Sequence, residues 1–322
     1  MRVFHRFSTS HEDLIHDVSY DFYGKRIATC SSDQKIKVWD LNDNGEWGLS
    51  AEWKAHSGSV WKLAWAHPEF GQVIASCSFD RTVCIWEESE DEKGQKRWQL
   101  KATLVDSRDS VTDIKFAPKS SGLRLATCSS DGYIRIYEAM DIMNLSQWTI
   151  VEEFEPQKGS NNCISWNPSS YDKPMMAVGS NDPYLKIWEY NETGQKWVHL
   201  DTLSPVGNNN NYDSSESGKA IHDVCWAPNM GRSYHLIATA SKDHTVRIWK
   251  LTNIHDKSKM ELKEIMCKND HRSEVWRVEW NITGTVLASS GDDGNVFLWK
   301  CNMNGEWKLL SIINGEERNE DR

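Results

Sequence analysis

One short pattern occurs six times along this chain, and it limits the available folds more than any other feature. In each copy a short apolar strand is followed by a turn rich in Ser and Asp, and then by an alternating strand that ends in Trp or Tyr. The six closing aromatic residues are Trp39, Trp86, Tyr137, Trp188, Trp249 and Trp299. Their separations of 47, 51, 51, 61 and 50 residues are longer than the period of most helical repeats.

Each copy is flanked by two further segments with a strand pattern. The preceding segments lie at 16–21, 59–65, 111–116, 162–166, 221–226 and 274–280, and the following segments lie at 47–53, 98–104, 147–154, 196–203, 261–266 and 307–313. They show period-two alternation and β-branched residues, with Gly, Asn, Asp or Pro between them. Four strands repeated six times predict an all-β fold, a WD-repeat β-propeller with six four-stranded blades.

The six blades are expected to follow one another in a single domain. Their predicted bounds are 11–54, 55–105, 106–155, 156–204, 219–267 and 268–313, after an N-terminal strand within 1–10. The loop 205–218 and the tail 314–322 lie outside the blades and are expected to be solvated. The apolar fraction is only 39%, but the chain has 17 Trp, and each buried Trp removes roughly 150–250 Å² from water.

Two polar positions recur with the strands. An Asp lies between the second and third strand of each blade, where its side chain can bond backbone amides and close the hairpin. These residues are Asp33, Asp80, Asp131, Asp182, Asp243 and Asp293 or its neighbour Asp292. His11, His56 and His271 precede the first strand in three blades. We expect His–Ser–Asp–Trp hydrogen-bond sets there, with a structural role rather than a catalytic one.

Charge and composition exclude several classes of protein. Lys and Arg number 37 and Asp and Glu 47, which gives a formal net charge of −10 and argues against direct nucleic-acid binding. No apolar run approaches the ~20 residues that span a bilayer, and the first twenty residues are too polar for a secretory signal. We therefore expect a soluble, intracellular protein with no transmembrane segment.

No motif in the chain nominates an enzyme, a metal site or a cofactor site. The eight cysteines include no C-x-x-C pair, so reduced structural cysteines are expected. The segment from His11 to His16 has one residue too many for a metal-binding H-E-x-x-H helix, and neither G-x-S-x-G nor G-x-G-x-x-G occurs. The sequence predicts a non-enzymatic protein with no small-molecule substrate.

One strand is left over when the blades are counted. The last copy has its own outer strand, Trp307 to Ile313, yet the segment Val3 to Phe7 precedes His11 as outer strands precede the other copies. In one interpretation the C-terminal segment frays and Val3–Phe7 closes the ring at six blades. In the other, the ring stays open and a partner supplies three inner strands, which would pair exposed edges in trans. Strand counting does not decide between them.

Several long blocks carry a family resemblance over essentially the whole chain. They are residues 11–40, 56–88, 104–119, 131–148, 162–170 and 276–294. With these blocks the chain resembles the Seh-type nucleoporins, WD-repeat subunits of the Y-shaped scaffold of the nuclear pore. The related vesicle-coat propeller shares the first two blocks but is expected to lack the strings at 143–148 and 281–294.

The resemblance implies the open interpretation, at the nuclear pore complex of the nuclear envelope. Family members are incomplete six-bladed propellers that a helical scaffold nucleoporin completes with a three-stranded blade, and they support protein and mRNA transport. The same propeller serves in the GATOR complex, which relays amino-acid sufficiency to the TOR kinase at lysosomes, and the pore subcomplex visits kinetochores. The alternatives are a closed WD-repeat adapter that reads linear peptides on its top face and a scaffold subunit of a vesicle coat.

The resemblance and the leftover strand together predict where a partner binds. The contact residues are expected in the N-terminal segment and in the exposed first strands of blades one and six. They are Val3, Phe4, Phe7, Val18, Tyr20, Trp276 and Val278.

Overall fold

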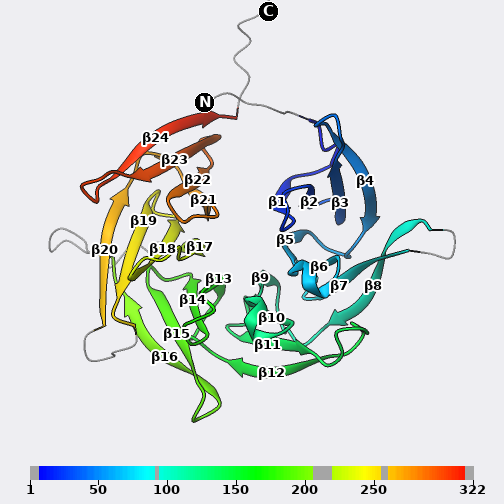
Figure 1. Cartoon of the computed structure of the whole chain (residues 1–322), viewed down its shortest axis with the longest axis horizontal. Coiled ribbons are helices and arrows are strands. Elements are labelled where there is room, and N and C mark those ends of the chain that lie inside the picture. Colours follow the sequence, from blue (N-terminus) through cyan, green and yellow to red (C-terminus); the bar gives the residue numbers. More distant parts are fainter. Residues whose placement is uncertain (1–6, 91–93, 206–219, 255–259, 316–322) are drawn as a thin grey trace, which may run out of the picture. The chain divides into compact units, whose positions relative to one another are not determined.

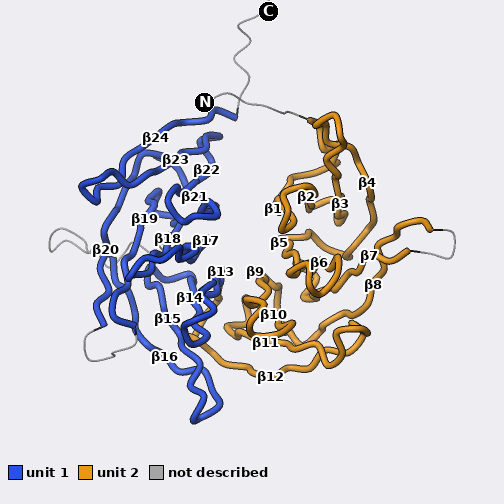
Figure 2. Tube along the Cα trace, in the orientation of Figure 1, with its two compact units in different colours: residues 1, 162–322 blue, residues 2–161 orange. Residues whose placement is uncertain are grey.

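The computed structural model describes residues 7–90, 94–205, 220–254 and 260–315. The chain divides into two compact units, residues 2–161 and residues 162–322 with residue 1, which are described separately (Figure 2). The regular secondary structure of the described residues is almost entirely β-strand, in six antiparallel four-stranded sheets whose strands pair in chain order (Figure 1). We call these sheets blades 1 to 6. The prediction of an all-β fold of six four-stranded propeller blades is confirmed.

Blades 1 to 3 form the unit of residues 2–161. Blade 1 contains β1 (Ile15–Tyr20), β2 (Arg26–Ser31), β3 (Lys35–Leu41) and β4 (Trp47–Lys54). Blade 2 contains β5 (Val60–Trp65), the 3-10 helix η1 (Pro68–Phe70), β6 (Val73–Ser78), β7 (Val83–Glu90) and β8 (Lys96–Leu104). Blade 3 contains β9 (Val111–Phe116), η2 (Lys119–Ser121), β10 (Arg124–Ser129), β11 (Ile134–Ala139) and β12 (Trp148–Phe154).

Blades 4 to 6 belong to the unit that begins at residue 162. Blade 4 contains β13 (Asn161–Trp166), β14 (Met175–Ser180), β15 (Leu185–Asn191) and β16 (Lys196–Leu203). Blade 5 contains β17 (Ile221–Trp226), β18 (Tyr234–Ser241), β19 (Val246–Thr252) and β20 (Glu261–Lys268). Blade 6 contains β21 (Val275–Trp280), β22 (Val286–Gly291), β23 (Asn295–Cys301) and β24 (Trp307–Asn314).

The core of each unit lies between consecutive blades. In the first unit Cys30, Ile36 and Val38 of blade 1 pack against Val60 and Leu63 of blade 2. Blade 2 packs against blade 3 in the same way, as blade 4 does against blade 5 and blade 5 against blade 6. We call the face of a blade that is directed toward the preceding blade its front face and the opposite face its back face, so that within a unit the back face of one blade packs on the front face of the next.

The turn between the second and third strand explains the recurrent Asp. The residue after the Asp has a positive φ at Gln34, Arg81, Gly132, His244 and Gly294, a conformation that strains residues other than glycine. The Asp side chain compensates by accepting backbone hydrogen bonds, as Asp33 does from the amide of Lys35 at 3.0 Å. Blade 4 has Pro183 at this position, whose ring fixes a negative φ.

Every outer strand contains one extra residue opposite the closing aromatic position. In blade 1, for example, Val38 pairs with Ala51 but Trp39 pairs with Leu49. The same register shift occurs in the other five blades. Such a β-bulge bends the strand and increases its twist.

The C-terminal strand is paired in this structure. The predicted outer strand from Trp307 to Ile313 forms β24, which pairs with β23 along its length. Blade 6 thus has an outer strand of its own without Val3 to Phe7. Val3 and Phe4 lie outside the described residues, as do most of the predicted loop 205–218 and residues 316–322 of the tail. Among the described residues, no helix is long and apolar enough to cross a membrane.

Candidate partner-binding surface

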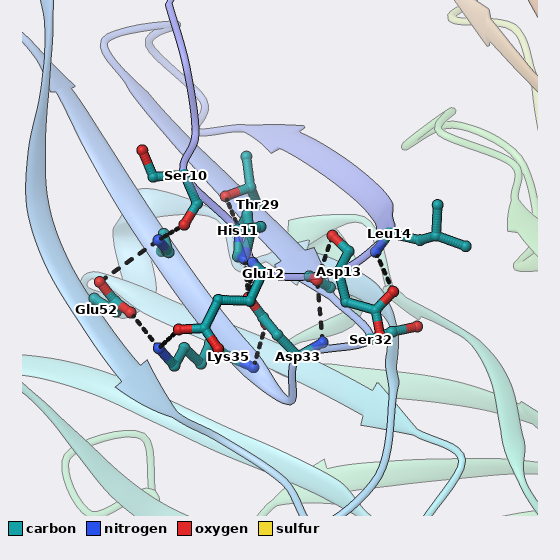
Figure 3. Close-up of polar contacts among 12 residues, drawn as sticks. Ser10, His11, Glu12, Asp13, Leu14, Thr29, Ser32, Asp33, Lys35 and Glu52 are labelled. Carbon is teal, nitrogen blue, oxygen red and sulfur yellow. Dashed lines mark hydrogen bonds and ion pairs between the residues drawn. The ribbon is translucent and has the colours of Figure 1, made fainter.

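The His residues before the first strands form the expected hydrogen-bond sets. In blade 1, His11 Nδ1 lies 2.7 Å from Asp33 Oδ2 and His11 Nε2 lies 2.9 Å from Thr29 Oγ1 (Figure 3). Trp39 Nε1 donates to the same hydroxyl at 3.2 Å. The predicted set is therefore present, with a threonine in place of serine.

Blades 2 and 6 contain the same set with serine. His56 lies 2.8 Å from Ser76 Oγ, which also accepts from Trp86 Nε1 at 3.0 Å. In blade 6, His271 contacts Asp293 at 3.0 Å and Ser289 at 2.8 Å, and Trp299 Nε1 donates to Ser289 at 2.9 Å. Asp293, rather than Asp292, is thus the turn carboxylate of blade 6.

Blades 3 and 5 hold the turn Asp with an arginine. Arg135 pairs with Asp131 at 2.9 Å, and Arg247 pairs with Asp243 at 2.6 Å. In blade 4, Asp182 instead accepts from the hydroxyl of Ser180 at 2.8 Å. All six turn carboxylates therefore close their hairpins, but with different partners.

In blade 2, His56 Nδ1 lies 3.1 Å from Asp80 Oδ2, and the pKa values of the two groups shift in the directions that favour an ion pair. Burial alone would lower the pKa of His56, but hydrogen bonds to Asp80 and Cys84 outweigh burial and raise the pKa to about 9. Burial raises the pKa of Asp80, while the bonds from His56 and Thr82 outweigh burial and hold it well below its usual range. The pair fixes the start of blade 2. Across the described ranges, no group of three or more His, Cys, Asp or Glu is placed to hold a metal ion.

The front face of blade 1 differs from those of the other blades. Ile15, Val18 and Tyr20 of β1 are 42%, 52% and 58% exposed. We call these three residues the blade 1 face. The residue equivalent to Val18 in blade 2 is Leu63, which is only 2% exposed because blade 1 covers it. β1 is the first strand among the described residues, and no earlier blade among them covers this apolar face as blade 1 covers Leu63.

Phe7 lies on this side of blade 1. Its ring centroid is 5.0 Å from that of Trp39 and 6.3 Å from that of Trp47. The next residues along the chain are held by Lys37, whose Nζ donates to Ser10 O at 2.8 Å. Phe7 and Tyr20 line a cavity of about 400 Å³ together with Ile27, Leu41 and Trp47.

The back face of blade 6 is also incompletely covered. Val296 and Leu298 of β23 and Ala288 and Ser290 of β22 are only half-buried. We call these four residues the blade 6 face. The equivalent residues of blade 1, Ala28, Cys30, Ile36 and Val38, are completely buried against blade 2. Blade 6 is the last blade among the described residues, and no later blade among them covers this face.

The structure brings together only some of the predicted contact residues. Phe7, Val18 and Tyr20 lie on the front side of blade 1. Trp276 is 42% exposed, but its ring stacks on His222 at 4.1 Å and its Nε1 donates to Asp292. The expected exposure of Val278 is wrong: it is 4% exposed because it lies on the front face of blade 6, packed against blade 5.

Sequence analysis missed Ile15 and the blade 6 face. Nothing in these residues distinguishes them from their buried equivalents, because Val296 and Leu298 are as apolar as Val246 and Ile248 of blade 5. They are distinguished instead by the place of blades 1 and 6 at the two ends of the series of described blades. Counting faces rather than strands would have identified the back face of the last blade.

Comparisons with known proteins agree with this architecture. The chain matches the family model of the WD domain, G-beta repeat, over residues 2–40, 47–87, 98–138, 210–250 and 262–300. It is 51% identical over 336 aligned positions to Nucleoporin SEH1 of Xenopus tropicalis, covering 98% of this chain and 89% of the relative. The Homo sapiens protein of the same name is 52% identical over 335 positions, with the same coverage of 98% and 89%. Nucleoporin SEH1 of Danio rerio is 52% identical over 329 positions, covering 96% and 86%.

Proposed function

The chain belongs to the SEH1 family of WD-repeat nucleoporins, and from this premise we propose that it is a non-enzymatic scaffold subunit of the Y-complex of the nuclear pore. In this role it binds a helical scaffold nucleoporin, which inserts three strands next to blade 1. The scaffold supports nucleocytoplasmic transport of proteins and mRNA.

The exposed blade 1 face is the observation that carries the proposal. Complete burial of a Val or Ile side chain stabilises a complex by roughly 1.5–3 kcal/mol. Ile15, Val18 and Tyr20 are about half exposed, so about half of that stabilisation is still available from each when a partner covers it. An inserted blade would provide this stabilisation by packing on β1 in the way that blade 1 packs on blade 2. The partner residues that face β1 are therefore expected to be apolar.

The position of Phe7 supports the role that this proposal gives to the N-terminal segment. Trp53, on the outer strand of blade 1, lies 5.5 Å from the closing Trp86 of blade 2. Phe7 lies in the same way against the closing Trp39 of blade 1. It therefore takes the place of an outer-strand residue of a preceding blade. Val3 and Phe4 are proposed to continue that strand as the fourth strand of the inserted blade.

We extend the proposed contact to the blade 6 face. Its half-buried Val296 and Leu298 present the apolar chemistry that back faces use against the next blade. Trp276 remains a proposed contact at the edge of the same blade, while Val278 contributes by supporting β21 from within the core.

The family resemblance extends the proposal to a second role. The same propeller is proposed to join the GATOR complex, which signals amino-acid sufficiency to TOR at the lysosomal surface, and to accompany the pore subcomplex to kinetochores. These roles rest on the resemblance, whereas blade completion also rests on the exposed faces.

The test is a native pull-down at moderate salt from cells of the source organism, with partners identified by mass spectrometry. Wild type is compared with Val18→Arg, which places a charge on the blade 1 face. Val105→Arg is the matched control, because Val105 is an exposed valine, at 67% against 52% for Val18, that lies outside the strands. Thermal unfolding of the isolated variants verifies that both are folded.

We expect wild type and Val105→Arg to recover a helical protein in stoichiometric amount, and Val18→Arg to lose it. Deleting a short strand-forming segment of that partner is expected to have the same effect. Stoichiometric recovery by Val18→Arg contradicts the proposed surface. Recovery of only substoichiometric peptide-motif clients by wild type instead favours a closed adapter.

A further inference from the structure

One charged position changes sign between the blades. The residue after the closing aromatic residue pairs across the sheet with the first part of the second strand, as Asp40 does with Arg26. It is acidic in blades 1 to 4 and basic in blades 5 and 6. The residues are Asp40, Glu87, Glu138, Glu189, Lys250 and Lys300.

The acidic residues at this position are neutralised within the chain. Arg26 pairs with Asp40 at 2.7 Å, Lys101 with Glu87 at 2.9 Å, and Arg124 with Glu138 at 3.3 Å. Lys173 lies 3.8 Å from Glu189 in blade 4. In contrast, no carboxylate of the described residues pairs with Lys250 or Lys300. Two cations are thus uncompensated in a chain with a net charge of −10.

Both lysines line one cavity between blades 5 and 6. Its volume is about 360 Å³, and its walls include Arg232, Tyr234, Cys301 and Trp307. The ammonium group of Lys250 lies 4.4 Å from the ring centroid of Tyr234. Three cations therefore converge on a partly aromatic hollow within one unit of the chain.

The equivalent place between blades 1 and 2 is filled by a carboxylate. Arg26 donates to both oxygens of Glu88, at 2.7 and 2.8 Å, beside Trp98, which pairs with Glu88 across the sheet. In blade 6, Trp307 takes the position of Trp98, but the residue it pairs with is Cys301. The hollow between blades 5 and 6 therefore lacks the carboxylate that Glu88 supplies.

Arg232 is a fixed cation in the wall of this cavity. Its Nη1 donates to Gly284 O at 2.7 Å and its Nη2 to Pro228 O at 2.6 Å, which fixes the guanidinium group. Its Nε is buried and has no hydrogen-bond partner in the described part of the chain. Burial lowers the pKa of Arg232. Burial also acts on Arg26, but bonds to Glu88 and Asp40 outweigh it and raise the pKa of that residue.

We propose that the cavity between blades 5 and 6 binds an acidic segment of a partner protein, with one side-chain carboxylate in the place that Glu88 fills between blades 1 and 2. Lys250 and Lys300 supply the opposite charge, and Tyr234 and Trp307 contact the aliphatic part of the acidic residue. This site is independent of the blade 1 face and of the proposed role at the nuclear pore.

Fluorescence anisotropy of the full chain with a fluorescein-labelled hexaglutamate peptide tests the proposal. A Gly/Ser peptide of the same length is the negative control, and a Gly/Ser peptide with one phosphoserine tests phosphate instead of carboxylate. We expect saturable binding of hexaglutamate that weakens as salt is raised, because exposed charges are screened.

Two variants and a matched control assign the binding to the cavity. Lys250→Glu/Lys300→Glu is expected to weaken hexaglutamate binding at least about tenfold, because two cations that attract the peptide carboxylates are replaced by two anions that repel them. Lys196→Glu/Lys268→Glu changes the net charge equally at exposed lysines of other strands and is expected to leave binding within about twofold. Cys301→Glu supplies the missing carboxylate from within the chain, so it is expected both to abolish binding and to raise Tm.

Three outcomes overturn the site. The first is equal weakening by the two double variants, which indicates non-specific attraction. The second is unchanged binding by Cys301→Glu. The third is no saturable hexaglutamate binding by wild type up to about 1 mM, and if the phosphoserine peptide binds in that case, the cavity recognises phosphate rather than carboxylate.

Discussion

The ring of Phe7 packs on the ring of Trp39 at a centroid distance of 5.0 Å, as a residue from the outer strand of a preceding blade would. Phe7 belongs to the described segment before β1, residues 7–14. Trp39 in turn donates to Thr29, which joins it to His11 and Asp33. The described segment from Phe7 to His11 is thus fastened to blade 1 at two points, by the Phe7 ring on Trp39 and by the hydrogen bond of His11 to Thr29.

Phe7→Ala is expected to weaken both blade 1 and partner binding. Removal of the half-buried ring loses its contacts with Trp39 and Trp47, so the free energy of unfolding should fall by about 1–2 kcal/mol. Phe22→Ala is the control, because Phe22 is an exposed phenylalanine of the same blade and should change stability by less than about 0.5 kcal/mol. Equal effects of the two substitutions in chemical denaturation contradict the role of Phe7.

Stability should fall as pH rises from 6.5 to 9. The folded pKa of His56 is about 9, above its ordinary value of 6.5, so its contribution is complete below pH 6.5 and is lost as pH rises through 9. One pKa unit corresponds to about 1.36 kcal/mol, so the loss is at most about 3 kcal/mol. The measurement compares the free energy of unfolding of wild type and His56→Asn at both pH values. Parallel pH profiles for the two proteins contradict the ion pair.

Two turn glycines separate backbone strain from a steric clash. Gly132 and Gly294 occupy the same turn position with φ of 89° and 68°. A Cβ at Gly132 would lie 2.9 Å from Gly159 O, whereas one at Gly294 meets nothing within 4 Å. Gly294→Ala should therefore cost about 1 kcal/mol from its positive φ, and Gly132→Ala should cost about 1–3 kcal/mol more. Equal costs in urea denaturation show that the neighbouring loop moves freely.

Arg26→Met should be much more disruptive than Arg124→Met. Arg26 holds Glu88, whose side chain is only 7% exposed, whereas the side chains of Arg124 and Glu138 are 36% and 35% exposed. Leaving a buried carboxylate unpaired costs about 3–5 kcal/mol, while loss of an exposed pair costs about 0–1 kcal/mol. Thermal unfolding of both variants measures the difference. Similar Tm values for the two variants contradict the view that a carboxylate between blades requires its cation.

The repeats made the blades predictable from the sequence. Trp39, Trp86 and their equivalents mark the third strands, and the Asp before each of them marks the turn, so local chemistry located the strands. The residue types along a strand do not, by contrast, predict which of its side chains are exposed. Val18 is exposed and Leu63 is buried although both are apolar residues of first strands, and Val278 was expected to be exposed although it lies in the core. Only the order in which faces meet distinguishes these residues.

The cavity between blades 5 and 6 shows a second limit of what can be predicted from the sequence. The change from Glu189 to Lys250 and Lys300 is visible in the printed letters, but its meaning depends on cross-strand pairing. The pairing of Cys301 with Trp307 and of Glu88 with Trp98 identifies the two as equivalent. A periodic pattern locates strands, whereas the absence of a carboxylate becomes evident only when two inter-blade sites are superposed.

The bulge in every outer strand also bears on how the sequence can change in length. Side chains alternate between the two faces of a strand, so an extra residue would reverse the phase of everything beyond it unless a bulge accommodates it. Ser50 is the accommodated residue in blade 1, between Leu49 and Ala51. Leu49 pairs with Trp39 and Ala51 with Val38, so these two residues already lie on opposite faces of β4. Each outer strand can therefore lose its bulge residue without exchanging its core-facing and solvent-facing side chains, whereas loss of a residue elsewhere in the strand would exchange them.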